Sequence, residues 1–355
     1  MRDPARCRLS GAGIDLDHRI GCGIRVWEKV CRLSGAGIDH RARRRPTPYH
    51  GAVRYCLQFP NRAAKVLAEW LGDGRFSDFG VVAEEAGFDA VSVYDHPFPD
   101  DGWAAHGHLA LDPFVSLAAV GEATRRIRLV TNILVSGYRS PYVAAQALAT
   151  LDRFSGGRVV VGIAAGYLRS EFEVLGGRYE GRGERLDDAI AAMRSAWTGS
   201  SVDRDGHFPA HGHTMFPTPV QQPVPVWVGG NSRRAMRRAA ELGDGWLPLS
   251  MTEAEAAVAK TPPLSTFDHL RERIGIMARL REDAGKGPIE IAFPPFERYV
   301  RDWDESTAQL AANRQQYADA GVTWMMVVAT ARSLAQLRDQ AARFADVVIS
   351  KDPDR

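Results

Sequence analysis

Residues 90–96 read AVSVYDH, an apolar run that ends in an aspartate and a histidine. Similar apolar runs follow along the chain, with helix-like stretches between them: IRLVTNI at 127–133, VVVG at 159–162 and VPVWVGGNS at 224–232. Strand-then-helix units whose strands end in small, polar or histidine residues are typical of a (β/α)₈ barrel, in which the active site lies at the carboxyl ends of the strands. The sequence therefore predicts an α/β chain folded as a TIM barrel.

The whole chain supplies the eight alternations that a closed barrel needs. Val and Ile occupy both faces of the predicted strands, as expected for parallel strands that are buried twice. Strands are predicted near 53–59, 90–95, 127–135, 158–164, 224–229, 245–249, 289–293 and 324–329. Helices are predicted near 77–87, 113–123, 141–153, 184–197, 232–242, 266–284, 306–320 and 333–346. A loop at 98–112 and a Gly/Pro-rich insertion at 199–223, before strand five, interrupt this pattern.

The first residues differ from the rest of the chain. CRLSGAGID at 7–15 recurs at 31–39, and a basic, proline-bearing linker follows at 41–48. Two copies are too few for a repeat architecture, and Gly, Arg and Asp dominate the segment. We expect residues 1–51 to be a disordered extension and residues 52–355 to form one barrel domain.

The composition narrows the class of protein. Forty-five Lys and Arg residues against 43 Asp and Glu residues give a net charge of +2, which does not indicate a nucleic-acid partner. Apolar runs are too short to cross a bilayer, and the start has no apolar segment of a secretory signal. The four cysteines contain no C-x-x-C pair, so neither a zinc site nor a disulfide framework is indicated. We expect a cytoplasmic protein that acts on a small molecule, without nucleic-acid or membrane partners.

His96 is the leading catalytic candidate. A histidine at a strand end can act as a general acid or base, because its ordinary pKa lies near neutrality. The alternative is a histidine that caps the strand through backbone hydrogen bonds. Asp95 has the opposite side-chain direction on an ideal strand, so we interpret it as an orienting, hydrogen-bonding residue.

The sequence Gly229-Gly230-Asn231-Ser232 joins a predicted strand to a predicted helix. Glycines permit close backbone approach, and the N-terminus of a helix offers free N–H groups to an anion. Asn231 or Ser232 could instead be a plain helix cap. No Walker-type motif is present, so the pattern favours a cradle for a cofactor phosphate over an NTPase loop.

Further candidates lie at other strand ends. Asn132 interrupts an apolar run, which indicates either a bulge at Asn132-Ile133 or a satisfied polar residue inside the barrel. The segment from Gly162 to Gly166 is rich in small residues. It could be only a tight turn between strand and helix, or it could leave room for the flat ring of a cofactor. His106 and His108 are placed in a loop over the barrel mouth, and histidines at this spacing are a poor metal signature. Substrate-facing positions just past strand ends are Trp103, Tyr138, Arg139, Tyr167 and Glu171.

Three segments together resemble a known family. They are DAVSVYDH at 89–96, RIRLVTNILV at 126–135 continuing into SPYVAAQALATLDRFSGGRVVVGIAAGYLRSEF at 140–172, and PVPVWVGGNSRRAMRRAAELGDGWLPLS at 223–250. Their order and spacing resemble the bacterial luciferase-like oxidoreductases, and the nearer likeness is to the branch that uses coenzyme F420, a 5-deazaflavin. The resemblance extends from about Val53 to Ser250 and more loosely to the C-terminus.

The resemblance implies roles for named residues. His96 would lie beside the deazaflavin ring with Asp95 as its acidic neighbour, and Asn132-Ile133 would form a non-proline cis peptide in a bulge behind the ring. Gly229, Gly230, Asn231 and Ser232 would cradle the cofactor phosphate. Ser170, four residues past Gly166, would touch the cofactor tail. Tyr167 departs from the glutamate of the sugar-phosphate dehydrogenase branch, which argues against a glucose-6-phosphate-like substrate.

The implied activity depends on the cofactor. With coenzyme F420 the protein would transfer a hydride to or from a small organic substrate, and His96 would donate or accept the proton. With FMN it would be a two-component flavin monooxygenase served by a separate cofactor-reducing enzyme. A homodimer is also implied. Two alternative classes are a flavin-binding barrel without catalysis and a metal-dependent hydrolase, which would need several His and Asp residues at strand ends.

Overall fold

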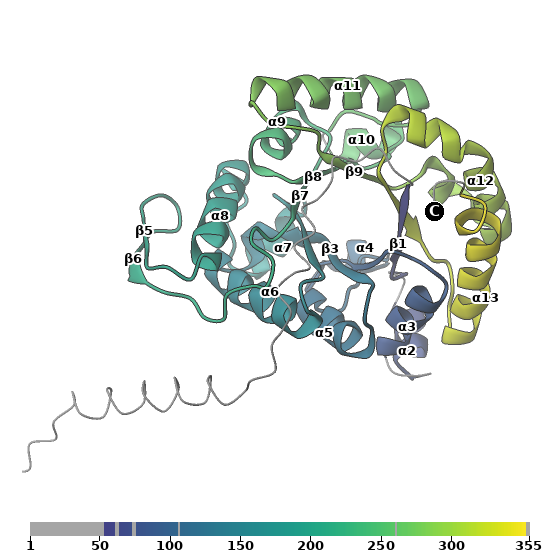
Figure 1. The fold of residues 1–355 in the computed structure, drawn as a ribbon, viewed down its shortest axis with the longest axis horizontal. Helices are drawn as coiled ribbons and strands as arrows, with labels where there is room; N and C mark the ends of the chain where they lie inside the picture. The colour runs from purple at the N-terminus through teal and green to yellow at the C-terminus, as the bar shows by residue number, and fades with distance from the viewer. Residues whose placement is uncertain (1–52, 61–63, 73–75, 106, 260, 353–355) are drawn as a thin grey trace, which may run out of the picture. The chain divides into compact units, whose positions relative to one another are not determined.

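Eight parallel strands close into a ring that helices surround (Figure 1). The computed structural model describes residues 53–60, 64–72, 76–105, 107–259 and 261–352. Neighbouring strands follow the order β1-β10-β9-β8-β7-β4-β3-β2, and every pair in the ring is parallel. The strands are β1 (Arg54–Gln58), β2 (Ala90–Val93), β3 (Arg128–Val135), β4 (Val159–Ala164), β7 (Val226–Gly229), β8 (Gly245–Leu247), β9 (Glu290–Phe293) and β10 (Trp324–Val328). The predicted barrel is confirmed.

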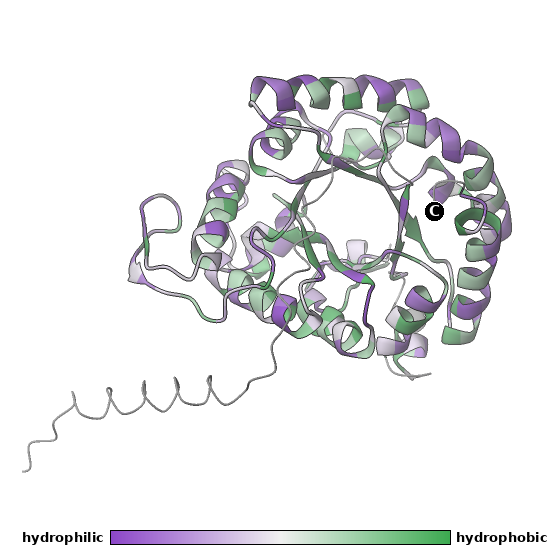
Figure 2. Cartoon of the chain, viewed as in Figure 1, coloured by the Kyte–Doolittle hydropathy of each residue, from purple (hydrophilic) through white to green (hydrophobic). Residues whose placement is uncertain are grey.

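The predicted helices are all present on the outside of the ring. They are α3 (Ser77–Glu85), α5 (Pro113–Ala123), α6 (Pro141–Ser155), α8 (Arg182–Trp197), α9 (Arg233–Leu242), α11 (Phe267–Asp283), α12 (Trp303–Ala320) and α13 (Leu334–Phe344). Their hydrophobic faces turn toward the strands and their polar faces outward (Figure 2). Local signals set their ends: Asp112 accepts hydrogen bonds from the first amides of α5, and Gly156, at a φ of 70°, ends α6.

Side chains fill the lumen of the ring. Alternate strand residues point inward, and the inward set comprises Cys56, Ala90, Val130, Val160, Trp227, Leu247, Ala292, Trp324 and Met326. Trp227 and Trp324 meet edge-on with ring centroids 5.2 Å apart. The barrel is therefore packed below its mouth, so that chemistry must take place at the ends of the strands.

Several short elements were not predicted from the sequence. They are α2 (Ala64–Gly72), α4 (Asp101–Ala105), α7 (Arg169–Val174), α10 (Glu253–Ala259), η1 (Ser136–Tyr138), η2 (Phe296–Tyr299), η3 (Ala345–Ile349), and the hairpin of β5 (Val202–Arg204) and β6 (Ala210–His213). The hairpin lies inside the predicted insertion before strand five. The buried carboxylate of Asp152 fixes the return of this insertion by accepting the amides of Val220 and Gln221 at 2.7 and 2.9 Å.

Two predictions concern residues that lie outside the part of the chain that the structure describes. Residues 1–51, expected to be an extension, lie there, so the boundary before residue 52 stays a prediction. His106 is also outside the described residues. Among the described helices, none combines the length and the apolar character that a membrane span requires.

Candidate active site

His96 and Glu171 form a pair at the carboxyl ends of the strands. His96 follows β2, and Glu171 lies on α7, which follows β4. Nδ1 of His96 is 3.0 Å from Oε2 of Glu171, and the side chains are 11% and 0% exposed. A ring nitrogen that binds a carboxylate fixes the orientation and tautomer of the imidazole, which leaves Nε2 as the nitrogen for chemistry.

Glu171 is held by three donors. Tyr138 donates its hydroxyl to Oε2 at 2.6 Å, and the amide of Phe98 donates to Oε1 at 3.0 Å. Burial alone would raise the pKa of Glu171, but the hydrogen bonds from His96, Tyr138 and Phe98 outweigh it and hold the pKa below its ordinary value. Burial and the bond to Glu171 raise the pKa of Tyr138, which therefore remains a hydrogen-bond donor. Glu171 is thus an ionised acceptor for His96 at neutral pH.

Asp95 faces a different set of partners from His96. Its carboxylate is 1% exposed and binds the guanidinium of Arg139 through two bonds of 2.6 and 2.7 Å. Oδ2 also accepts the amide of Val135 at 2.9 Å. Asp95 therefore ties the end of β2 to the end of β3 and η1. The acidic partner of His96 is Glu171, which corrects the expectation that Asp95 would be that partner.

An aromatic wall stands beside His96. The ring of His96 lies 5.3 Å from His108 and 6.2 Å from Tyr167 between centroids, both edge-on. Trp103 on α4 contacts both of those residues, at 4.5 Å from His108 and 5.6 Å from Tyr167. Trp103 and Tyr167, predicted from their positions past strand ends, and His108, predicted in a loop over the mouth, thus gather around the catalytic candidate.

The bulge predicted in β3 is present. The register with β4 shifts between Thr131 and Leu134, and the peptide bond between Asn132 and Ile133 is cis. Gly229 at the end of β7 lies close to this bulge, because a Cβ atom at Gly229 would be 2.4 Å from Cδ1 of Ile133. The end of β7 and the bulge of β3 therefore form one surface.

The Gly-Gly-Asn-Ser segment leads from β7 into α9. Gly230 has a φ of 117°, and its carbonyl accepts the indole N–H of Trp246 at 2.9 Å. The buried Asn231 side chain exchanges two hydrogen bonds with the backbone of Leu249, at 2.8 and 2.9 Å. Ser232 caps α9 by accepting the amide of Ala235. The side chain of Asn231 is thus used within the loop, whereas the Ser232 hydroxyl accepts one bond and keeps its own O–H to donate. That hydroxyl, the backbone amides and the start of α9 can meet an anion.

Gly166 and Ser170 occupy the loop after β4. Gly166 has a φ of 82°, and a Cβ atom there would be 2.6 Å from Val135 and 2.8 Å from Phe172. Its carbonyl accepts Nε of Arg182 at 2.9 Å. Ser170 donates its hydroxyl to Asp100 at 2.6 Å, and this bond joins α7 to the start of α4. Sequence reasoning did not identify Asp100.

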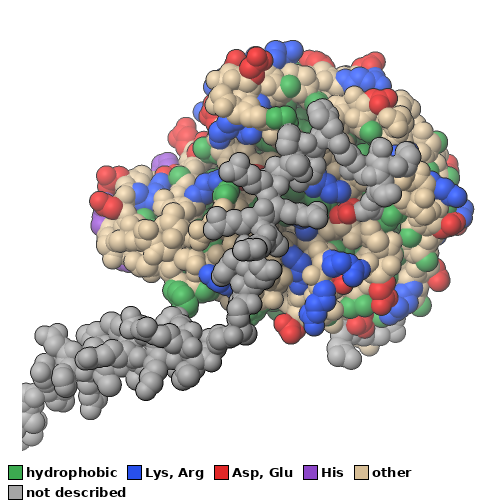
Figure 3. All heavy atoms as spheres, in the orientation of Figure 1, with side chains coloured by type: hydrophobic (Ala, Val, Ile, Leu, Met, Phe, Trp, Pro, Cys, Tyr) green, Lys and Arg blue, Asp and Glu red, His purple; other side chains and the backbone are tan. Residues whose placement is uncertain are grey.

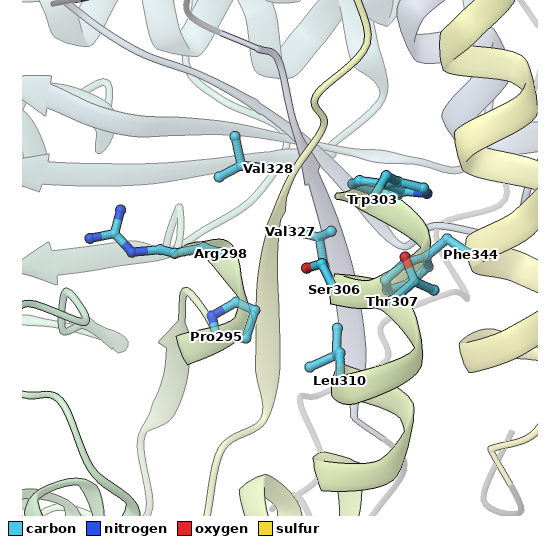
Figure 4. A pocket seen from close by; sticks show the side chains of 9 residues that line it. All are labelled: Pro295, Arg298, Trp303, Ser306, Thr307, Leu310, Val327, Val328 and Phe344. Atoms are coloured by element: carbon cyan, nitrogen blue, oxygen red, sulfur yellow. The ribbon is translucent and has the colours of Figure 1, made fainter. Parts of the chain in front are cut away.

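These features fit a flat, phosphorylated cofactor. The missing side chain at Gly229 lets the end of β7 lie against Ile133 in the bulge, and a side chain there would displace this surface. The crevice between η2, α12 and β10 does not fit such a group (Figure 4). Its volume of about 20 Å³, lined by Trp303, Leu310 and Phe344, has room for one or two water molecules.

Other kinds of site receive no support from the described residues. Among them, no three His, Cys, Asp or Glu side chains are arranged to hold a metal ion. Acidic and basic side chains are interspersed over the face seen in Figure 3, without one extended patch of a single sign.

Curated relatives were found by sequence. The F420-dependent glucose-6-phosphate dehydrogenase of Gordonia bronchialis is 33% identical over 205 residues, which cover 56% of this chain and 60% of the relative. The enzyme of the same name from Intrasporangium calvum is 34% identical over 236 residues, 63% of this chain and 70% of the relative. The chain thus matches about 60% of the length of the Gordonia enzyme.

Solved structures share the fold. Monooxygenase RslO1 from Streptomyces bottropensis superposes with a TM-score of 0.68 at 20% identity, covering 84% of this chain and 99% of that one. An F420-dependent secondary alcohol dehydrogenase in complex with an F420-acetone adduct superposes with a TM-score of 0.64 at 17% identity, over 84% and 99% of the two chains. The sequence profile described as luciferase-like monooxygenase matches residues 71–281, well over half of the chain. Together with the barrel, this match shows that the chain belongs to the luciferase-like monooxygenase family.

Proposed function

We propose that this protein is an oxidoreductase that uses coenzyme F420 to transfer a hydride to or from a small organic substrate. The observation that carries the proposal is the His96–Glu171 pair at the barrel mouth, on the face that also carries the bulge of β3 and the loop into α9. The pair provides for proton exchange, and the surface of the bulge and the loop fits a cofactor ring and its phosphate. The names of the curated relatives support the choice of F420.

His96 is the proposed proton donor and acceptor. Glu171 accepts the Nδ1–H of His96, so that Nε2 faces the substrate and can take or give one proton. An ionised Glu171 also stabilises the imidazolium that forms when His96 takes the proton. Trp103, His108 and Tyr167 line this side and exclude water from the substrate.

The cofactor would extend from the bulge of β3, which neighbours β2, to the loop after β7. The backbone amides of Asn231 and Ser232 and the start of α9 would bind its phosphate, whereas the amide of Gly230 already donates to the carbonyl of Leu247. Ile133 in the bulge would back the ring. The 5-deazaflavin ring, when bound, supplies a carbon centre that accepts or releases a hydride. Asn231 would act indirectly, because its side chain fixes the loop whose amides meet the phosphate. Ser232 would cap α9 and could also donate its hydroxyl to the phosphate.

We propose an alcohol or carbonyl compound as the substrate class. Hydride transfer coupled to proton exchange at His96 interconverts these two groups. Glucose 6-phosphate belongs among the first compounds to be assayed, because the curated relatives are named for it. However, Tyr167 occupies the position at which the resemblance places a glutamate in the sugar-phosphate dehydrogenase branch. Tyr167 offers an aromatic face 44% exposed in place of a charge, which favours less polar alcohols.

A second candidate is FMN chemistry, which one observation favours. The matched family and the similar protein RslO1 are both named as monooxygenases, and the same loop could hold the phosphate of FMN. In that case the protein would need a separate enzyme to reduce the flavin.

We also propose a homodimer, for which the exposed Val115, Val143 and Phe154 on α5 and α6 offer an apolar flank.

Equilibrium binding of F420 and of FMN to the full chain tests the proposal. We expect F420 to bind at least about tenfold more tightly, a difference of about 1.4 kcal/mol. Oxidation of the alcohol panel with F420 as acceptor should then yield reduced cofactor. Tighter binding of FMN, followed by oxygen-dependent turnover with a reductase, would replace the proposal with the monooxygenase.

A further inference from the structure

Gln58 is a buried polar residue at the mouth of the barrel that the proposed mechanism does not use. It ends β1, and it lies two residues after Cys56, which belongs to the inward-facing set. Leu57 and Phe59 pack instead in the core between strands and helices. Since side chains two apart on a strand share a face, Gln58 points into the barrel, one layer closer to the mouth than Cys56.

Among the residues that the structure describes, none accepts a hydrogen bond from the side-chain amide of Gln58. The residue is 3% exposed, and its Nε2 atom is buried with no hydrogen-bond partner among the described residues. A glutamine amide has two N–H donors, and the large majority of buried polar side-chain atoms in native proteins are paired. An unpaired donor kept at the carboxyl end of a barrel strand therefore points to a bound molecule that supplies the acceptor.

The place of Gln58 in the ring indicates which molecule. β1 is the neighbour of β2, with Gln58 opposite Ser92, and β2 leads directly into His96. The phosphate loop follows β7, which is four strands from β1 in either direction around the ring of eight. Gln58 thus lies on the His96 side of the mouth and across the barrel from the phosphate loop.

We propose that Gln58 is a substrate-binding residue whose side-chain amide donates a hydrogen bond to the alcohol or carbonyl oxygen at which His96 exchanges a proton. The inference rests on the proposed function, because it takes its substrate class from that reaction. The amide does not titrate, so it holds the oxygen in both the alcohol and the carbonyl state. A fixed N–H at this oxygen also stabilises the negative charge that develops there as the proton and hydride move.

The variant Gln58→Met tests the role, since Met is of similar length and has no N–H. Without ligand, we expect a melting temperature equal to or above that of the wild type, because an unpaired donor has been removed. A fall of more than about 4 °C would show that the amide already has an internal partner such as a trapped water, and would overturn the proposal.

Kinetics with F420 supply the second arm, with glucose 6-phosphate, 2-propanol and cyclohexanol as probes. We expect kcat/KM for the best probe to fall about 10- to 100-fold in Gln58→Met, while the F420 Kd stays within about twofold of the wild type. If the affinity for F420 falls as much as kcat/KM does, the amide of Gln58 contacts the cofactor and not the substrate, which would overturn the proposal. The control Cys56→Ala, one layer below on the same face, should keep the wild-type kcat/KM; an equal loss there would show a packing effect and overturn it too.

A third readout separates this inference from the proposed function. In protein labelled with ¹⁵N-glutamine, the Gln58 amide signal is identified by its absence in Gln58→Met and should shift when the alcohol probes are added. A wild type that binds no F420 but shows this shift refutes the proposed cofactor and supports the role of Gln58. F420-dependent turnover with an unmoved signal refutes the role of Gln58 and leaves the proposed function standing.

Discussion

The imidazole of His96 and the carboxylate of Glu171 lie 3.0 Å apart although 75 positions separate them in the sequence. The barrel makes this contact, because the loops after β2 and β4 open onto the same face. Replacing Glu171 with Gln keeps the shape and removes the ionised acceptor. We expect kcat to fall roughly 100-fold, because His96 loses its fixed tautomer and the charge that stabilises its protonated form.

Steady-state kinetics with the best alcohol measure this effect. The matched control is Glu173→Gln on the same helix, since Glu173 is 65% exposed and only approaches Arg169 at 3.9 Å. That variant should keep the wild-type kcat. Equal rates for Glu171→Gln and the wild type would remove Glu171 from the proposed mechanism.

The stability of the protein should depend on pH through Glu171. Its pKa is lowered in the folded state, so its contribution to stability is complete above the ordinary glutamate pKa and is lost as the pH falls through the lower folded value. We expect the difference in unfolding free energy between the wild type and Glu171→Gln to shrink as the pH falls below about 5, where Glu171 itself takes up a proton. Urea denaturation between about pH 5 and pH 3 measures the difference; a difference that grows over this range would contradict the assignment.

Asp95 should matter chiefly for folding. Its buried carboxylate neutralises Arg139, so Asp95→Asn leaves a largely buried guanidinium without its charge partner. We expect a loss of about 3–5 kcal/mol in unfolding free energy, against less than about 0.5 kcal/mol for the exposed pair broken in Glu173→Gln. Urea denaturation measures both. A fall in kcat well below the melting temperature would reveal a catalytic contribution of Asp95 beyond this positioning.

The main architecture was predictable because it depends on long, strongly apolar strands separated by amphipathic helices. The hairpin at β5 and β6 was missed, since strands of three and four residues with polar ends carry little hydrophobic pattern. Glu171 was placed past a strand end, but no local rule shows that α7 turns its carboxylate toward His96. Likewise, the sequence suggests a cradle at Asn231, whereas only the tertiary structure shows that its side chain holds the backbone of Leu249.

Ser170 offers a test of how the cofactor tail is bound. The resemblance places Ser170 at the tail, but the single hydroxyl hydrogen is already donated to Asp100. We expect Ser170→Ala to change the F420 Kd by less than about twofold. Asp100→Asn should tighten binding, because it removes a negative charge near an anionic tail while its amide oxygen can still accept the Ser170 hydroxyl. Fluorescence titration of F420 measures both, and weaker binding by Ser170→Ala would establish a direct contact.

Gly229 should be essential for cofactor binding because there is no space for a side chain. A Cβ atom at this position would lie 2.4 Å from Cδ1 of Ile133, so Gly229→Ala must push Ile133 toward the proposed ring site or displace the end of β7. Overpacking of this kind lowers the free energy of unfolding by about 1–3 kcal/mol. We expect the F420 Kd to rise at least about tenfold. The unfolding free energy should fall by about 1–3 kcal/mol. The control is Gly275→Ala on α11, where a Cβ atom would meet nothing within 4 Å and where alanine favours the helix. That control should bind F420 like the wild type and be slightly more stable.

If Gly229→Ala loses stability but binds F420 normally, the end of β7 serves packing alone, and the cofactor ring does not lie against Ile133.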